Sequence, residues 1–493
     1  MERITRSNVL LSVKTRALFL FFSLFWSTLI IAQNTFSRTY ADTFRMTALN
    51  KRAIELADST YMIAVSGIQG SVPGSYCRIL NVDRDGEVIR DKFEYVEYSR
   101  FNGRAQLLQS NDGNFVLTDS RLVTWGIATT RIMVFKFNET LIDTIWRFEN
   151  SDSVWFDIPI DFVKCLNRDL ALIASRASIN SPDSMQTLFI RLSESGTLLS
   201  KKVYNFTRKV TGLGVVELSD GSFLIGGSKQ DEGEQLHGIL FKVDSSGNLL
   251  WQRDYTQLIA NGLSLYDSTS VLLSGYVPAS SSRPRLLRLN VENGDIIFDK
   301  QNNYTQTAEL YISRKLSNND IYSVGLTSNT TESNSGFYMR CDSMGNPIYL
   351  RRVNYLNEVD FFLDFIETSD GGILINGAAA DTPEDGGQNL WLVKLDSLGC
   401  LEPDCWVGVE QADANTLGVA VYPNPTTNWL YLKYDNTHKI TLEIFNLSGQ
   451  LVLQHQQMAP KEGIEISHLP SGLYLLRFVD EFGNMAAEKL VVE

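Results

Sequence analysis

A repeat of about 50 residues runs through most of the chain. The clearest copy contains four short runs rich in apolar and β-branched residues: Gly214–Leu218, Ser222–Gly227, His237–Asp244 and Asn248–Tyr255. Asp-Gly and Ser-Gly turns separate the runs, and glycine supplies the positive φ that a tight hairpin needs. Four strands in each repeat of this length are typical of a β-propeller blade. The sequence therefore predicts an all-β fold.

The turn between the third and fourth strands marks the period. In one copy this turn carries Thr140. In the other copies it carries a glycine: Gly86, Gly196, Gly247, Gly294, Gly345 and Gly399. Counting these turns predicts a seven-bladed β-propeller over residues 33–405. The last copy, Asn389–Gly399, has no fourth strand, whereas Phe36–Tyr40 matches the fourth-strand pattern of Trp251–Tyr255. We predict that Phe36–Tyr40 completes the last blade and covers its open edge. The alternative is a disordered leader.

Tyrosines recur at the ends of predicted fourth strands, at Tyr204, Tyr255, Tyr304 and Tyr355. They could line a rim that binds sugars. Because they end outer strands, we favour a role in packing one blade against the next.

The N-terminal residues have the three parts of a secretory signal peptide. Basic residues precede the apolar run Ala17–Ala32, and polar Gln33 follows it. We predict a signal peptide over residues 1–32, cleaved between Ala32 and Gln33. A retained anchor is the alternative, but the run is shorter than the roughly 20 residues that span a bilayer. No later segment is apolar enough, so the mature protein is expected to have no membrane span.

The formal net charge of −13 argues against nucleic acid as a partner, because a binding surface for phosphates needs many cations. It also argues against an anionic membrane surface. The five cysteines are too few for a disulfide-built fold. Three of them lie in apolar runs and are expected to be buried free thiols: Cys77, Cys165 and Cys341. Cys400 and Cys405 bracket four residues and are predicted to form a disulfide.

Residues 406–418 lack the repeat and are interpreted as a linker. Residues 419–493 contain seven short alternating runs, which is the size of a small immunoglobulin-like β-sandwich. The runs are Val419–Tyr422, Trp429–Tyr434, Lys439–Asn446, Leu451–Gln456, Gly463–Ser467, Gly472–Val479 and Met485–Val492.

Four blocks in this C-terminal segment carry a specific resemblance. They are Tyr422-Pro423-Asn424-Pro425, then Ile444–Val452 with Gly449, then Leu469–Leu476 with Gly472 and Tyr474, and finally Glu488–Glu493 with Lys489. In this order the segment resembles the type A C-terminal sorting domain of the type IX secretion system. The resemblance implies that the partners are the secretion machinery and its sortase-like peptidase, with cleavage between Cys405 and Val419. It implies a product that is secreted or attached to the outer surface of a Gram-negative bacterium. An ordinary immunoglobulin-like accessory domain is the alternative.

The repeat region contains no recognisable catalytic constellation, and no cofactor or metal site is predicted. Its one histidine, His237, is expected at a loop edge. Acidic residues near the starts of first strands could converge on the propeller axis: Asp161, Glu309, Asp360 and Asp364. The predicted function is a binding or scaffolding module. The alternatives are a polysaccharide hydrolase or lyase acting at the axis, through paired carboxylates, and a structural surface component.

Overall fold

The computed structural model describes residues 33–40, 52–68, 74–97, 105–122, 130–138, 140, 143–150, 155–178, 181–206, 209–231, 233–279, 282–301, 307–328, 334–355, 360–380, 388–402, 419–433, 440–446, 451–458, 463–480 and 485–493. These residues form 35 strands, and no helix occurs among them. Within the same ranges, no helix is therefore available to cross a membrane. The chain divides into two compact units, Met1–Leu401 and Glu402–Glu493. The prediction of an all-β protein is confirmed.

The first unit contains strands β1 to β28. Their bounds are β1 (Phe36–Tyr40), β2 (Ile54–Glu55), β3 (Tyr61–Ile68), β4 (Gly74–Val82), β5 (Val88–Glu97), β6 (Gln106–Gln109), β7 (Phe115–Leu122), β8 (Thr130–Phe137), β9 (Thr144–Glu149), β10 (Trp155–Lys164), β11 (Leu170–Ser178), β12 (Ser181–Leu192), β13 (Leu198–Tyr204), β14 (Lys209–Glu217), β15 (Phe223–Gln230), β16 (Leu236–Val243), β17 (Leu249–Tyr255), β18 (Ile259–Asp267), β19 (Ser270–Val277), β20 (Arg283–Asn290), β21 (Ile296–Gln301), β22 (Thr307–Lys315), β23 (Ile321–Ser328), β24 (Ser335–Cys341), β25 (Pro347–Val353), β26 (Phe361–Glu367), β27 (Ile373–Ala379) and β28 (Asn389–Leu395).

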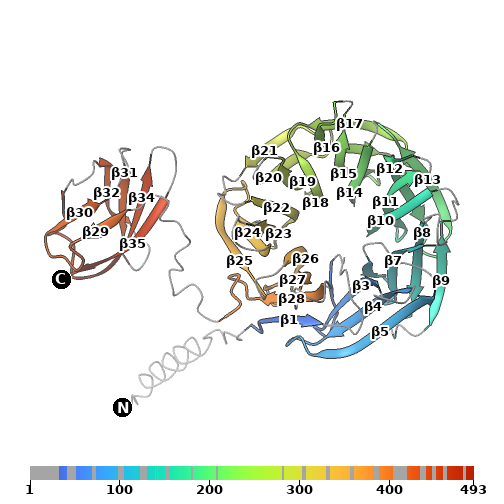
Figure 1. The fold of residues 1–493 in the computed structure, drawn as a ribbon, viewed down its shortest axis with the longest axis horizontal. Coiled ribbons are helices and arrows are strands. Elements are labelled where there is room, and N and C mark those ends of the chain that lie inside the picture. The colour runs from blue at the N-terminus through green and yellow to red at the C-terminus, as the bar shows by residue number, and fades with distance from the viewer. Residues whose placement is uncertain are drawn as a thin grey trace, which may run out of the picture. The chain divides into compact units, whose positions relative to one another are not determined.

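Consecutive strands pair antiparallel and build sheets that follow one another around a central axis, in the manner of a propeller (Figure 1). Three sheets have four strands in chain order: β2 to β5, β18 to β21 and β22 to β25. Strands β6 to β17 form one 12-stranded sheet. Inside it, β8 and β10 are joined by the single parallel pair Thr130↔Phe156, and β12 and β14 by Met185↔Lys209.

The last sheet of this unit takes its fourth strand from the other end of the chain. Its order is β1-β28-β27-β26, and β1 pairs with β28 from Phe36↔Lys394 to Tyr40↔Leu390. The side chains add a hydrogen bond, because the Trp391 indole N–H donates to the Ser37 hydroxyl at 2.9 Å. The prediction that Phe36–Tyr40 completes the last sheet is confirmed, and the alternative of a disordered leader is wrong.

The turn between the third and fourth strands explains the recurring glycine. In the copy at Asp244, Gly247 has φ +84° and donates its N–H to the Asp244 carbonyl at 2.9 Å. A Cβ on Gly247 would lie 2.8 Å from the Lys202 Cγ of β13, in the preceding group of four strands. Glycine is therefore required both by the backbone conformation and by the close approach of the neighbouring group.

Tyrosine phenols link one group of four strands to the next across this turn. Tyr204 at the end of β13 donates to the Gly247 carbonyl at 2.6 Å, and Tyr255 at the end of β17 donates to the Gly294 carbonyl at 2.7 Å. Both tyrosines are buried. The predicted packing role is confirmed for them. Tyr355 accepts a hydrogen bond from the Thr39 hydroxyl of β1 at 3.1 Å, and Tyr304 lies outside the described residues.

In six of the groups of four strands, an ion pair reaches the turn between the first two strands. A cation on the third strand reaches an aspartate in that turn, as when Lys394 contacts Asp370 at 3.0 Å and Arg340 contacts Asp320 at 2.7 Å. The other pairs are Lys136–Asp112, Arg191–Asp169, Lys242–Asp220 and Arg288–Asp267. The Lys394 side chain is fully buried, so this pair replaces the water that its ammonium loses.

Hydrophobic clusters fill the spaces between successive sheets. One cluster joins Leu240 of β16 to Leu273 of β19, for example. Another contains Tyr61 and Leu80 of the β2–β5 sheet together with Leu374 and Leu392 of the last sheet. The first and last sheets of the unit therefore share a core in the same way as consecutive sheets do.

The second unit consists of two sheets around one core. Its strands are β29 (Ala420–Tyr422), β30 (Trp429–Lys433), β31 (Ile440–Phe445), β32 (Leu451–Met458), β33 (Gly463–Glu465), β34 (Gly472–Asp480) and β35 (Met485–Val492). The sheet orders are β29-β30-β33 and β32-β31-β34-β35. Buried Leu430, Leu442, Ile464 and Phe478 from both sheets belong to the same cluster. All seven predicted strands are present.

The cysteines follow the sequence prediction where the structure describes them. Cys77, Cys165 and Cys341 are buried and form no disulfide, as predicted. Cys400 is disulfide-bonded. Its predicted partner, Cys405, lies outside the described residues, and so does most of the predicted linker.

Candidate functional site

A cavity of about 850 Å³ lies within the first unit, where the innermost strands of the sheets face one another. Its lining comes from β2, β6, β10, β14, β18, β22 and β26, or from residues next to them. A volume of this size is typical of sites for small molecules or short chains. Because every sheet contributes, the cavity depends on the arrangement of the whole unit.

The innermost strands share a β-bulge that shapes this cavity. The pairing register shifts at the same place in five of them: between Pro159 and Asp161, Gly212 and Gly214, Ala260 and Gly262, Leu310 and Ile312, and Phe362 and Asp364. The extra residues of four of these strands line the cavity, and they are Leu213, Asn261, Tyr311 and Leu363. A bulge turns a side chain out of the regular alternation, so these residues add to the lining.

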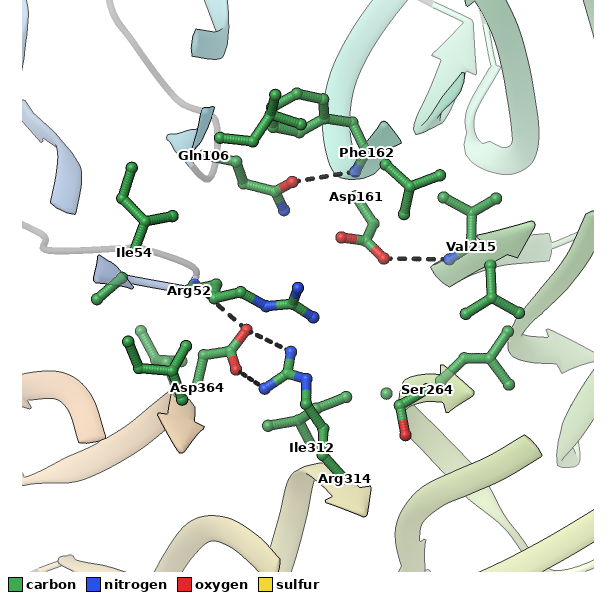
Figure 2. A pocket seen from close by; sticks show the side chains of 18 of the residues that line it. Arg52, Ile54, Gln106, Asp161, Phe162, Val215, Ser264, Ile312, Arg314 and Asp364 are labelled. Carbon is green, nitrogen blue, oxygen red and sulfur yellow. Dashed lines mark hydrogen bonds and ion pairs between the residues drawn. The ribbon is translucent and has the colours of Figure 1, made fainter. Parts of the chain in front are cut away.

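A fixed ion pair occupies one wall of the cavity (Figure 2). Both terminal nitrogens of Arg314 donate to the Asp364 carboxylate, one of them at 3.0 Å. Arg314 also donates to the Phe365 carbonyl at 2.8 Å, and Asp364 accepts the Phe365 N–H at 2.7 Å. The Asp364 side chain is 5% exposed. This carboxylate is committed to a charge-assisted, two-bond contact and is poorly placed to exchange a proton with a substrate.

Arg52 lies two residues before the start of β2 and lines the same cavity. Its backbone N–H donates to Asp364 at 3.2 Å, which joins the first sheet to the last. The guanidinium points into the cavity between Asp161 and Arg314 (Figure 2). The Arg52 side chain is exposed in the cavity. The neighbouring Arg314 cation lowers the pKa of Arg52, with burial as a smaller cause.

Asp161 and Gln106 form the opposite wall. The Asp161 carboxylate accepts the Val215 N–H at 3.1 Å. The Gln106 amide bridges two backbone groups of β10, since its oxygen accepts the Phe162 N–H at 3.0 Å and its nitrogen donates to the Ile160 carbonyl at 2.6 Å. These bonds fix polar side chains around a bulge.

Of the four acidic candidates, the structure brings only two to the cavity. Asp161 and Asp364 line it, and they occupy equivalent positions after the bulges of β10 and β26. Glu309 and Asp360 are not among the lining residues. Burial raises the pKa of Glu309, while Asp360 is buried and accepts the Tyr355 N–H at 2.7 Å.

His237 lies away from the cavity. Its ring contacts Asp231 at 2.9 Å near a loop, as expected. Across the described ranges, no three His, Cys, Asp or Glu side chains are grouped so that they could hold a metal ion.

Arg52 and Arg314 are the functional candidates that the sequence reading missed. Arg314 did leave a signal, because it follows the bulge by the same interval as Val163, Val216, Ser264 and Ile366 in other sheets. Arg314 is therefore a cation at a position where the other inner strands carry mostly apolar residues. Arg52 had no such signal, since only two residues of its strand pair with the next strand.

The sorting-motif residues meet around the last strand of the second unit. The Asn424 amide donates to the Lys489 carbonyl at 2.5 Å and accepts the Val491 N–H at 2.9 Å. Tyr422 stacks on Tyr431 with ring centroids 5.8 Å apart. Pro423 and Pro425 flank Asn424, and both follow cis peptide bonds.

The other motif residues lie in or near β34. Gly472 begins β34, and Tyr474 donates to the Pro470 carbonyl at 2.7 Å. Gly449 lies outside the described residues. At the predicted signal cleavage site, Ala32 also lies outside them, whereas Gln33 accepts the Ser397 N–H at 2.6 Å and donates to the Asp370 carbonyl.

Comparisons with known proteins identify the C-terminal segment. Residues 420–493 match the family described as the secretion system C-terminal sorting domain. The second unit therefore contains a type IX sorting domain at the C-terminus of the chain, and this domain implies export. No curated protein matches the chain.

Solved structures of low similarity match about three quarters of the chain. An α-L-arabinanase from Penicillium chrysogenum, complexed with arabinobiose, is 12% identical with a TM-score of 0.42, covering 74% of this chain and 99% of its own. The β-propeller domain of the Trilobed protease from Pyrococcus furiosus is 11% identical with a TM-score of 0.41, covering 71% and 95%. A protein of unknown function from Dyadobacter fermentans is 11% identical with a TM-score of 0.44, covering 73% and 97%. Similarity at this level does not extend to activity.

Proposed function

We propose that this is an exported binding protein whose site is the axial cavity. In this proposal, residues 1–32 are a signal peptide, residues 33–405 form a seven-bladed β-propeller, and residues 406–418 link it to an immunoglobulin-like sorting domain at 419–493. The sorting domain carries the chain to the type IX machinery. A sortase-like peptidase then removes it, and the product is released or attached to the outer surface of a Gram-negative bacterium.

The count of seven blades is supported by the few residue pairs that connect the three groups of strands within the 12-stranded sheet. Each of its three groups of four strands pairs antiparallel within itself, but only one residue pair connects each group to the next. Three such groups and four separate sheets make seven blades of four strands.

The state of Asp364 favours binding over catalysis. Hydrolysis or elimination through paired carboxylates needs two acids that can take up and release protons beside the substrate. Asp161 and Asp364 both reach the cavity, but Arg314 holds Asp364 through two bonds. This single observation makes a binding module the better proposal, with a polysaccharide hydrolase or lyase as the alternative that it disfavours.

Export is tested by mass spectrometry of cells and medium for the full-length gene and for a gene lacking residues 419–493. We expect the mature protein outside the cell to run from Gln33 to the linker, and the shortened protein to stay in the periplasm. Export that does not depend on residues 419–493 would contradict this part of the proposal.

Binding is tested by incubating the mature protein with a panel of oligosaccharides and measuring both affinity and products. We expect binding without new products. The Leu213→Trp variant should weaken it, because a larger side chain at this bulge fills the cavity. The outer-strand variant Leu250→Trp is the matched control, since Leu250 is 54% exposed on β17. Shortened chains in the mass spectrum would favour the enzyme instead.

A further inference from the structure

Arg52 places a guanidinium group in the cavity, where a ligand can reach it. Among the described residues, no side chain or carbonyl forms a hydrogen bond or ion pair with it, and only its backbone N–H is bonded. The Arg52 side chain is exposed in the cavity, so an anion that enters can pair with it without first breaking a contact within the protein. Arg52 is therefore available to a ligand.

Arg52 is the cation of the cavity lining that no protein group holds among the described residues, because Lys164 donates to the Asn111 side chain at 2.8 Å. Arg314 is neutralised by Asp364, and both are fixed to the Phe365 backbone. Asp161 attracts Arg52 through space, but its carboxylate is held by the Val215 N–H on the opposite wall. The nearby Arg314 cation lowers the pKa of Arg52, whereas the Asp364 and Asp161 carboxylates raise it.

Another part of the cavity wall is aromatic and apolar. Tyr311 and Phe361 both line the cavity and meet edge to face, with ring centroids 6.4 Å apart and planes at 88°. Leu213 and Leu363 add apolar surface from their bulges, and Asn261 adds an amide that is tied to the Leu310 carbonyl at 2.9 Å. Aromatic faces beside polar groups suit a sugar ring, which has an apolar C–H face and a rim of hydroxyls.

Together these features specify the ligand further. We infer that the axial cavity binds a saccharide that carries an anionic group, with Arg52 as the residue that pairs with that group. This inference rests on the proposed binding function. A uronate carboxylate or a sulfate ester supplies the anion, since the arginine fork can donate two hydrogen bonds to either of them.

The test is calorimetric titration of the mature protein with a tetrasaccharide of galacturonic acid. The methyl-esterified tetrasaccharide is the matched neutral probe, and a sulfated carrageenan tetrasaccharide and a tetraglutamate peptide complete the set. We expect at least one acidic saccharide to bind about tenfold or more tightly than the neutral ester, and addition of salt to weaken that binding. The better of the two acidic saccharides identifies the anion.

The variant Arg52→Gln should weaken binding of the acidic saccharide by roughly 10- to 100-fold, which corresponds to the loss of a charged hydrogen-bonding partner. Arg52→Lys should recover part of the loss, because the charge remains but the two-pronged geometry does not. Arg253→Gln is the control, since Arg253 lies on the outer strand β17 and pairs with exposed Asp295. It removes the same charge without touching the cavity.

Equal binding of the acid and the ester, an unchanged affinity in Arg52→Gln, or tighter binding of the peptide would overturn the inference. If the ester binds as well as the acid and Leu213→Trp abolishes both, the cavity is still a binding site and only the ligand class is wrong. If none of the saccharides binds, the inference and the proposed function fail together.

Discussion

The phenol of Tyr40 donates a hydrogen bond to the carbonyl of Gly86 at 2.8 Å. Tyr40 ends β1 in the last sheet, and Gly86 lies in the turn between β4 and β5 of the first sheet. The same contact joins Tyr204 to Gly247 and Tyr255 to Gly294 between consecutive groups of four strands. The two ends of the propeller region therefore meet through the link that joins its interior sheets.

A second repeated contact makes the same connection. Glu55 of β2 accepts the N–H and the hydroxyl of Ser369 in the last sheet, both at 2.7 Å. Glu367 of β26 accepts the same two groups from Ser317 in the preceding sheet, at 2.7 and 2.6 Å. The tyrosine and glutamate links lie at different turns, so each can be tested alone.

The first prediction concerns the tyrosine link. Tyr40→Phe removes the phenol and leaves a buried carbonyl without its donor, so we expect the free energy of unfolding to fall by about 1–2 kcal/mol. Tyr204→Phe is the matched control at an interior link and should cost about as much. The measurement is urea denaturation of the mature protein. A loss in Tyr204→Phe without any loss in Tyr40→Phe would show that the two ends do not depend on this contact.

The second prediction concerns a buried acid. Asp119 in β7 is fully buried and accepts hydrogen bonds from the Ser66 hydroxyl at 2.8 Å and the Ser120 N–H at 2.7 Å. Burial raises the pKa of Asp119 from 3.8 to about 7. The folded state therefore prefers the protonated acid. The protonated Asp119 therefore adds to the free energy of unfolding. This addition is complete below pH 4 and is lost as the pH rises through 7.

Asp119→Asn keeps the shape of the protonated acid and cannot ionise. We expect the variant and the parent to unfold at similar temperatures near pH 4.5. Near pH 8 the variant should be more stable, by roughly 2–4 kcal/mol from about 1.4 kcal/mol per pKa unit. Asp231→Asn is the control, because hydrogen bonds from His237 and Gln235 lower the pKa of this surface acid. A stability difference for Asp119→Asn that does not change with pH would contradict the prediction.

The sequence predicted the strands and the exchanged β1 because their signals are local. An Asp-x-x-Gly turn reports its own backbone conformation, and Phe36–Tyr40 carries the pattern of a fourth strand. Cavity-lining residues are a different matter, since Arg52 and Asp364 are 312 residues apart and meet only when the first and last sheets pack together. The bulges in the inner strands depend on how the strands pair. The residues at the bulges, Leu213, Asn261, Tyr311 and Leu363, share no residue type from which a bulge could be predicted.

The third prediction concerns thiol reactivity. Burial raises the pKa of Cys165 and of Cys341 to about 12, so both thiols stay protonated at pH 8. Thiolate is the reactive form, and we expect neither cysteine to react with iodoacetamide until the protein unfolds. Non-reducing peptide mapping should also find Cys400 joined to Cys405. Rapid labelling of Cys341 in the folded protein would contradict the buried thiol, and a free Cys405 would contradict the predicted pair.

The last prediction concerns the sorting domain. Asn424 ties the Tyr422–Pro425 block to the final strand through Lys489 and Val491. The adjacent backbone extends this contact, because Thr426 donates to the Val491 carbonyl and accepts from the Glu493 N–H, both at 2.9 Å. Asn424→Ala removes the two side-chain bonds and leaves the strand pairing of β35 with β34 in place. We expect the contact between the block and the final strand to weaken, because only the Thr426 backbone bonds remain, and the exported fraction to fall severalfold.

The measurement is the ratio of mature protein in the medium and on the cell surface to precursor in the periplasm. Thr427→Ala is the matched control, because Thr427 is exposed beside the same block and has no side-chain hydrogen bond among the described residues. Normal export of Asn424→Ala, with the same thermal stability as the parent, would show that this contact is dispensable. A loss of export in both variants would point to the surface of the block and not to its link with the final strand.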